Sequence, residues 1–268
     1  MIDFENKLSY DVYDLKEIIA LLRAPGGCPW DIEQTHESIR RNLLEEAYEA
    51  AEAIDENDAE HLREELGDVL MQVVFHCDIE EKSGRFTLND AADEACRKLI
   101  RRHPHVFGDV TAVSSGEVLH NWDIIKKEEK NQTTVSEAMH SVARSLPALW
   151  RAEKIQSKAA KAGTDVSVWS GEPESEGAAL PESAGGEALR GAAEEVNERD
   201  NAMQGLSRVC RELEAAVSSG MDIEERLGDM LFSAVNLARC RNVDPENALS
   251  LASERFISWY ARMENAAQ

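Results

Sequence analysis

A short motif that occurs twice constrains the architecture of this chain. Leu66-Gly67-Asp68-Val69-Leu70 recurs roughly 160 residues later as Leu227-Gly228-Asp229-Met230-Leu231. Each copy continues with an apolar stretch of helical spacing, then a turn and a further helical segment. Recurrence of the same elements in the same order indicates duplication of one folding unit. The sequence therefore predicts two copies of an all-α unit, arranged as two domains.

Helical periodicity extends over nearly all of the chain. Apolar residues recur three and four positions apart, and no segment shows the sustained alternation that is typical of strands. Thr35, Asp58 and Asn89 are residue types that favour the N-cap position, and each precedes a helical segment. Helices are predicted over residues 11–23, 35–54, 58–82, 89–103, 115–130, 147–161, 201–217, 223–240 and 244–264.

The stretch over about residues 170–200 differs in composition from the rest. It is rich in Gly, Ser, Pro, Ala and Glu and offers few apolar side chains to a core. We therefore expect a flexible acidic insertion here. The predicted domains are residues 1–130 and residues 131–268, with the insertion inside the second.

Charge and composition exclude several classes of protein. The formal net charge is −23, from 52 acidic and 29 basic residues, which argues against binding to a nucleic-acid polymer. No apolar run reaches the length of about 18 residues that a membrane-spanning helix needs. The first residues lack the basic and apolar regions of a signal peptide. The five cysteines show no CxxC spacing, so reduced thiols and a cytoplasmic location are expected.

Four carboxylates have a spacing that predicts a metal site. Residues three or four apart share one face of a helix, so Glu46 and Glu49 point together, as do Glu65 and Asp68. If the two helices pack antiparallel, the four side chains can converge, and Gly67 would allow close approach. Oxygen-only ligands suit Mg²⁺ or Mn²⁺ better than zinc. The alternative is a solvated acidic helix face, which is common in a chain this acidic.

Two further features are candidates for substrate binding. Lys98 and Arg102 lie one helical turn apart and could grip phosphate oxygens together, although a basic last turn is also favoured by the helix dipole. Trp30 lies in the loop Gly26-Gly27-Cys28-Pro29-Trp30-Asp31. Its ring could stack on a base or, equally, anchor the loop in a core. A carboxylate-held metal beside a basic pair is what phosphoryl chemistry needs.

These motifs together resemble those of the MazG-type nucleoside triphosphate pyrophosphohydrolases in their two-domain form, and the resemblance covers nearly the whole chain. It implies a tandem pair of MazG-like helical bundle domains, usually a homodimer, that cleaves nucleoside triphosphates to NMP and pyrophosphate with Mg²⁺. It also implies that Glu46, Glu49, Glu65 and Asp68 are the metal ligands. The residues that carry it are Gly26–Asp31, Gln34-Thr35-His36, the EExxE and ExxD pattern over 45–68, Arg102–Phe107, Asn121-Trp122-Asp123, Arg151–Gln156 and Val235–Arg239.

The second copy departs from this pattern. Arg211-Glu212-Leu213-Glu214-Ala215 stands where EExxE is expected, and Arg226 takes the place of the glutamate in ExxD, which leaves Asp229. Glu194-Glu195-Val196-Asn197-Glu198 is a competing EExxE, and Trp259 matches the position of Arg102. Because Arg226 puts a cation among the ligands, we expect weak or absent metal binding in the second copy.

The sequence thus predicts a Mg²⁺-dependent enzyme whose working site is in the first domain. Lys98 and Arg102 are expected to bind the triphosphate and Trp30 the nucleoside. The expected purpose, inferred from the resemblance, is removal of non-standard nucleotides or adjustment of the nucleotide pool. The alternative is a non-catalytic nucleotide or metal sensor, or a scaffold, whose duplicated domain serves dimerisation.

Overall fold

The computed structural model describes residues 4, 6–111, 114–129, 134–169 and 192–266, and its regular elements over those ranges are all helical. The prediction of an all-α fold is confirmed. The chain divides into two compact units, Met1–Trp122 and Asp123–Gln268. None of the described helices is long and apolar enough to cross a membrane.

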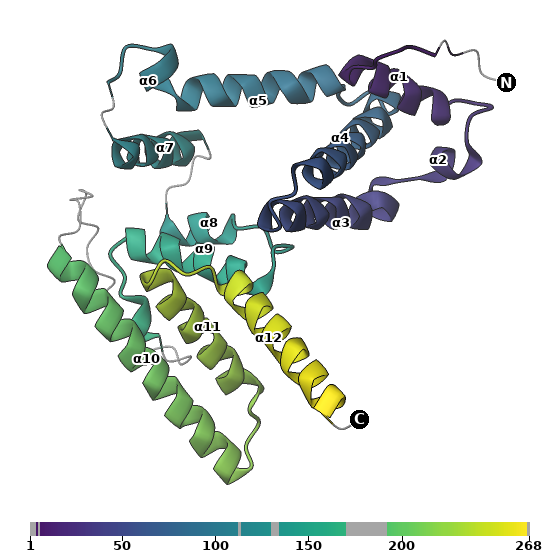
Figure 1. Cartoon of the computed structure of the whole chain (residues 1–268). Helices are drawn as coiled ribbons and strands as arrows, with labels where there is room; N and C mark the ends of the chain where they lie inside the picture. The colour runs from purple at the N-terminus through teal and green to yellow at the C-terminus, as the bar shows by residue number, and fades with distance from the viewer. Residues whose placement is uncertain (1–3, 5, 112–113, 130–133, 170–191, 267–268) are drawn as a thin grey trace. The chain divides into compact units, whose positions relative to one another are not determined.

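The first unit is built around an antiparallel helix hairpin, α3 and α4 (Figure 1). Thr35 caps α3, because its side chain accepts the backbone N–H of Ser38. Asp58 caps α4 by accepting from the N–H groups of Glu60 and His61. Both N-caps were predicted from the sequence. The elements are α1 (Val12–Leu22), α2 (Pro29–Glu33), α3 (His36–Asp55), α4 (Ala59–Lys82), α5 (Leu88–Arg102), α6 (Pro104–Phe107) and α7 (Ser115–Glu129), whose last residues belong to the second unit.

A small apolar cluster holds the hairpin against α1. Ile19 from α1, Ile39 from α3, and Val74 and Phe75 from α4 are all buried. Val74 is fully buried, so loss of its side chain would leave a cavity that the surrounding helices cannot easily fill. This packing fixes the relative position of α3 and α4, which carry the predicted carboxylates.

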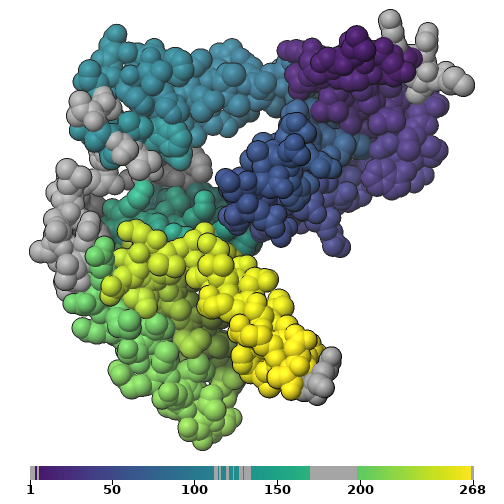
Figure 2. All heavy atoms as spheres, viewed as in Figure 1, coloured from purple at the N-terminus to yellow at the C-terminus, as the bar shows by residue number. Residues whose placement is uncertain are grey.

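The second unit repeats the hairpin with α10 and α11, and α9 packs against α11. α12 lies on the surface in Figure 2, where its bulky apolar side chains are largely exposed, among them Phe256 and Trp259. The elements are α8 (Val135–His140), α9 (Ala148–Lys161), the 3-10 helix η1 (Val166–Val168), α10 (Ala192–Ser219), α11 (Glu224–Cys240) and α12 (Pro245–Ala266).

The structure corrects the sequence predictions at two helix starts. Thr87, not Asn89, caps α5, because Thr87 and Asp90 form a reciprocal capping box that places Asn89 inside the first turn. Helix α10 begins at Ala192, so residues 192–200 are helical and not part of a flexible insertion. The remainder of the predicted insertion, residues 170–191, lies outside the described residues.

Candidate functional site

The α3–α4 hairpin brings three of the four predicted carboxylates together. Glu46 and Glu49 come from one face of α3, and Glu65 comes from the facing side of α4. One carboxylate oxygen from each lies within 4.8 Å of the others. We call these three residues the acidic cluster. It forms because i,i+3 spacing on one helix meets a carboxylate from the next helix across an antiparallel contact.

The acidic cluster contains a buried carboxylate with an unsatisfied oxygen and a glutamate whose pKa is raised. The Glu65 side chain is only 11% exposed, and its Oε2 atom is buried without a hydrogen-bond partner among the described residues. Burial, the charge of Asp68, a hydrogen bond with Glu49 and the charges of Glu49 and Glu65 all raise the pKa of the Glu46 carboxyl. A buried acceptor without a donor beside mutually repelling anions fits a bound cation. The all-oxygen donor set suits Mg²⁺ or Mn²⁺.

Asp68 lies one turn beyond Glu65 on α4 and is half-buried. It does not join the group within 4.8 Å, but its charge is the second largest cause of the raised pKa of Glu46. Asp68 is therefore within electrostatic reach of the acidic cluster.

Two neighbours of the acidic cluster differ from what the sequence predicts. A Cβ atom added to Gly67 would meet nothing within 4 Å, so close helix approach at Gly67 does not occur within the chain. His61, which the sequence analysis overlooked, places its Nε2 atom 3.2 Å from Oε1 of Glu65. The i,i+4 spacing of these two residues was the signal that could have identified the contact.

The basic pair lies elsewhere in the first unit. Figure 1 shows α5 starting beside the end of α4 and then diverging from the α3–α4 hairpin toward α6. Lys98 Nζ lies 3.5 Å from Glu94 of the same helix, and Arg102 is in the last turn. Within one chain the structure does not bring Lys98 and Arg102 beside the acidic cluster.

Trp30 is on α2, in a segment that the sequence analysis read as a loop. Its side chain is 59% exposed, which excludes the alternative that it anchors the segment in a core. An exposed tryptophan ring is available to stack on a planar ligand.

In the second unit an arginine stands among the corresponding carboxylates. Arg226 Nη1 lies 3.6 Å from Asp229 Oδ2 and 4.0 Å from Glu212 Oε2. Asp229 is buried, so the guanidinium offsets a charge that would otherwise be unfavourable inside the protein. Arg226 thus supplies a permanent positive charge from within the chain, whereas the basic side chain recorded beside Glu65 in the described part of the first unit is a histidine, His61.

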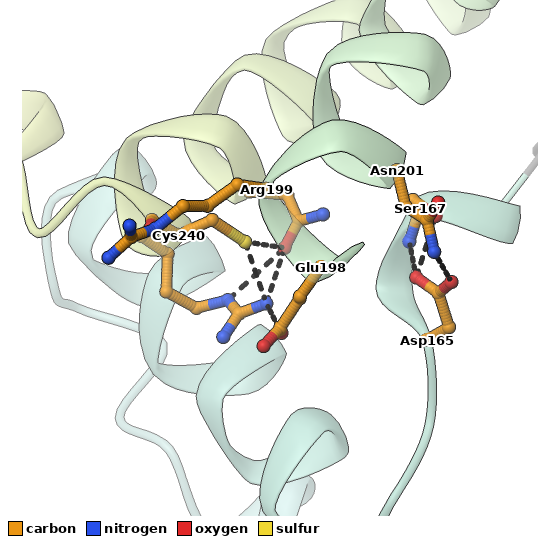
Figure 3. A network of polar contacts seen from close by, with 8 residues as sticks. Asp165, Ser167, Glu198, Arg199, Asn201 and Cys240 are labelled. Atoms are coloured by element: carbon orange, nitrogen blue, oxygen red, sulfur yellow. Dashed lines mark hydrogen bonds and ion pairs between the residues drawn. The ribbon is translucent and has the colours of Figure 1, made fainter. Parts of the chain in front are cut away.

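The last residue of the competing EExxE motif in α10, Glu198, forms an ion pair within the second unit. Glu198 lies 2.6 Å from Arg239 Nη2, and Arg239 also donates to Asn236. Figure 3 shows this network joining the start of α10 to Cys240 at the end of α11. Glu198 therefore helps to pack α10 against α11. The side chains of Glu194 and Glu195 lie outside the described part of the structure.

Comparison with known proteins identifies the family. Residues 34–107 match the MazG nucleotide pyrophosphohydrolase domain, a range that includes the acidic cluster. The chain is 40% identical over 251 residues to the nucleoside triphosphate pyrophosphohydrolase/pyrophosphatase MazG of Thermotoga maritima, which covers 94% of this chain and 84% of that protein. The chain belongs to the MazG family.

Two further relatives are similar over nearly the whole chain. The nucleoside triphosphate pyrophosphohydrolase of Escherichia coli K12 is 40% identical over 251 residues, with 93% of this chain and 86% of that protein covered. The uncharacterized protein YabN of Bacillus subtilis is 39% identical over 265 residues, and the chain spans 48% of its length. The similarity to the MazG proteins of Thermotoga and Escherichia therefore includes both units.

Replacement of Glu46 tests the repulsion inside the acidic cluster. With a chelator present at neutral pH, Glu46→Gln should unfold at a higher temperature than the wild type, because it removes one like charge. The pKa of Glu46 is higher in the folded than in the unfolded protein, so its protonation stabilises the fold. This stabilisation is fully present below the pKa of Glu46 in the unfolded protein. It is lost as the pH rises through the pKa of Glu46 in the folded protein. The advantage of the variant should therefore vanish below the ordinary pKa of a glutamate.

Added Mg²⁺ should reverse this order, since a ligand that binds only the folded state stabilises it. Thermal unfolding followed by circular dichroism measures both effects. Glu64→Gln, an exposed position on α4, is the matched control and should behave as the wild type. A wild-type unfolding temperature that neither Mg²⁺ nor Mn²⁺ raises would contradict a cation site here.

Arg226→Glu tests the role of the arginine in the second unit. The substitution removes the internal cation and restores the ExxD pattern, so titration calorimetry with Mn²⁺ should detect additional binding per chain. Arg241→Glu makes the same charge change at an exposed position and should add none. Mn²⁺ binding to the unmutated second unit, seen as binding that survives Glu65→Gln, would show that Arg226 does not exclude a metal.

Proposed function

We propose that the chain is a Mg²⁺-dependent nucleoside triphosphate pyrophosphohydrolase that produces NMP and pyrophosphate. The observation that carries the proposal is the acidic cluster, a set of converging carboxylates inside the range that matches the MazG nucleotide pyrophosphohydrolase domain. Two relatives that are 40% identical over most of the chain carry this activity in their names. Removal of non-standard nucleotides or adjustment of the nucleotide pool is the proposed purpose.

Glu46, Glu49, Glu65 and Asp68 would hold the metal. When bound, a divalent ion neutralises phosphate oxygens and makes a water molecule more acidic. The carboxylate of Glu65 would be held in one orientation, because His61 contacts its Oε1 atom. Its Oε2 atom has no hydrogen-bond partner among the described residues and would face the metal. The negative charge of Glu46 is unfavourable without a cation, since burial and the charges of neighbouring carboxylates raise the pKa of its carboxyl.

We infer that Lys98 and Arg102 bind the triphosphate from a second copy of the chain. Within one chain the basic end of α5 lies away from the carboxylates, so a homodimer is the arrangement that can bring the two together (Figure 1). None of the residues of α5 is buried. Its apolar residues Leu99 and Ile100 are 54% and 52% exposed. Contiguous exposed apolar side chains are typical of association surfaces.

The second candidate function is a non-catalytic nucleotide or metal sensor, or a scaffold. It is favoured by one observation, the arginine that stands among the carboxylates of the second unit. The two candidates differ in product. Incubation of the purified chain with each nucleoside triphosphate and Mg²⁺ should yield NMP and pyrophosphate if the proposed function is correct. Release of inorganic phosphate would contradict both candidates.

Glu49→Gln and Asp68→Asn test the site residues. Each replacement keeps the shape of the side chain and removes its charge. Pyrophosphate release should fall by about 100-fold or more, because loss of a residue that only supports a metal ligand already costs about 10- to 100-fold. Pyrophosphate release and circular dichroism should be measured together, because the fold should be unchanged. Glu64→Gln is the control and should retain activity. Full activity in both site variants would mean that the metal ligands are wrongly assigned.

Leu99→Glu tests the proposed homodimer. A buried charge at a subunit interface is unfavourable, so the variant should sediment as a monomer at concentrations where the wild type is a dimer. Asn89→Glu adds a charge at an exposed polar position of the same helix and should leave the dimer intact. A wild-type chain that sediments as a monomer at micromolar concentration would overturn the dimer.

A further inference from the structure

The segment that carries Trp30 combines an exposed aromatic side chain with a firmly held main chain. Trp30 is 59% exposed, on the five-residue helix α2. Helix α2 contributes no residue to the buried core of the first unit. Short helices of this kind have little packing of their own, so something else must fix them. The contacts around α2 identify Arg23 as that residue.

Arg23 is anchored on α4 by a buried ion pair. Its Nε atom lies 2.7 Å from Oδ2 of Asp78, and both side chains are 7% exposed. The guanidinium carbon lies 4.6 Å from the centre of the Phe75 ring, within cation–π range. Lys82 Nζ also lies 2.8 Å from Oδ2 of Asp78, so the carboxylate has two cationic partners. The planar guanidinium is thus held in one orientation on the side of α4.

The opposite edge of the same guanidinium reaches the Trp30 segment. Its Nη1 atom donates to the carbonyl oxygen of Asp31 and, at 3.3 Å, to that of Gln34. Gln34 in turn donates from Nε2 to the carbonyl oxygen of Trp30 at 2.7 Å. Arg23 therefore fixes the main chain immediately after Trp30 and, through Gln34, that of Trp30 itself.

A tight turn fixes the segment on its other side. A Cβ atom at Gly27 would lie 2.3 Å from the carbonyl oxygen of Leu22, a distance that no side chain tolerates. The backbone N–H of Cys28 donates to the same oxygen at 2.8 Å. The segment therefore leaves α1 along a defined path that only glycine permits at residue 27. Trp30 is held from both sides.

We propose that Arg23 is a positioning residue, which holds Trp30 as a preorganised aromatic contact for the base of the bound nucleotide. The inference rests on the proposed function, because it requires a nucleotide substrate. An exposed ring on a fixed main chain loses little conformational freedom on binding, which favours affinity. Arginine is required because one planar group serves a carboxylate on one edge and two carbonyl groups on another. A lysine ammonium group lacks that fork.

Arg23→Lys separates positioning from overall stability, because lysine can keep the charge opposite Asp78 and lose the carbonyl contacts. Trp30→Ala should raise KM by about 10-fold, as expected for one lost stacking contact, with kcat changed little. Arg23→Lys should also raise KM with little change in kcat. Since both variants remove the same contact, the double variant should have a KM no higher than Trp30→Ala alone.

Hydrogen exchange gives a second readout that does not depend on turnover. In Arg23→Lys, amides of residues 28–34 should exchange faster while those of the α3–α4 hairpin are unchanged. Arg41→Lys, whose side chain is 85% exposed, is the matched control and should alter neither KM nor exchange.

Each result decides the inference. Effects of Arg23→Lys and Trp30→Ala on KM that multiply in the double variant would overturn it, as would unchanged exchange over residues 28–34. A loss of kcat with unchanged KM in Arg23→Lys would also overturn it. A wild-type chain that releases no pyrophosphate from any nucleotide refutes the proposed function itself, and with it the role of Trp30. In that case, faster exchange of residues 28–34 in Arg23→Lys would still identify Arg23 as the residue that holds the segment.

Discussion

Repulsion among the carboxylates of Glu46, Glu49 and Glu65 is the force that the first unit has to oppose. The α3–α4 hairpin holds these side chains together through packing that lies elsewhere, around Val74 and Ile39. Apolar burial thus maintains an arrangement that electrostatics disfavours. The pKa of Glu46 is raised first by its burial and then by the charges of the neighbouring carboxylates. A protein keeps such an arrangement at functional sites, where a cation resolves the conflict.

The second unit resolves the same conflict in another way. Arg226 lies close to Asp229 and Glu212, so the positive charge there belongs to the chain. An internal cation is always present, whereas a bound ion depends on its concentration. The duplicated units therefore share a helix hairpin but differ in the source of positive charge. The second unit has Arg226, whereas the first would take a cation from solution. This difference is the physical basis for proposing a metal site in the first unit and none in the second.

Local rules explain which features the sequence predicted. The caps at Thr35 and Asp58 and the pairing of Glu46 with Glu49 depend on residues within one helical turn, so they could be predicted without tertiary structure. Thr87 and Asn89 are both good N-cap residues, and only the reciprocal contact with Asp90 selects Thr87.

Features that depend on distant contacts were beyond sequence reasoning. The direction in which α5 leaves α4 determines where Lys98 and Arg102 lie, and no spacing along α5 encodes it. Arg23 and Asp78 are 55 positions apart, so no local pattern connects them.

Helix α4 links the two parts of the proposed site. Near its start it carries Glu65, and near its end it carries Asp78, which anchors Arg23 and hence the Trp30 segment. A single helix that carries both would set the distance between the proposed metal ligands and the proposed aromatic contact. Under the proposed function, a ligand that engages both needs a base as well as phosphates, which a nucleoside triphosphate has. The proposed metal ligands would accept any phosphate with its metal, so under the proposed function we expect discrimination for nucleotides to come from the Trp30 segment that Arg23 holds.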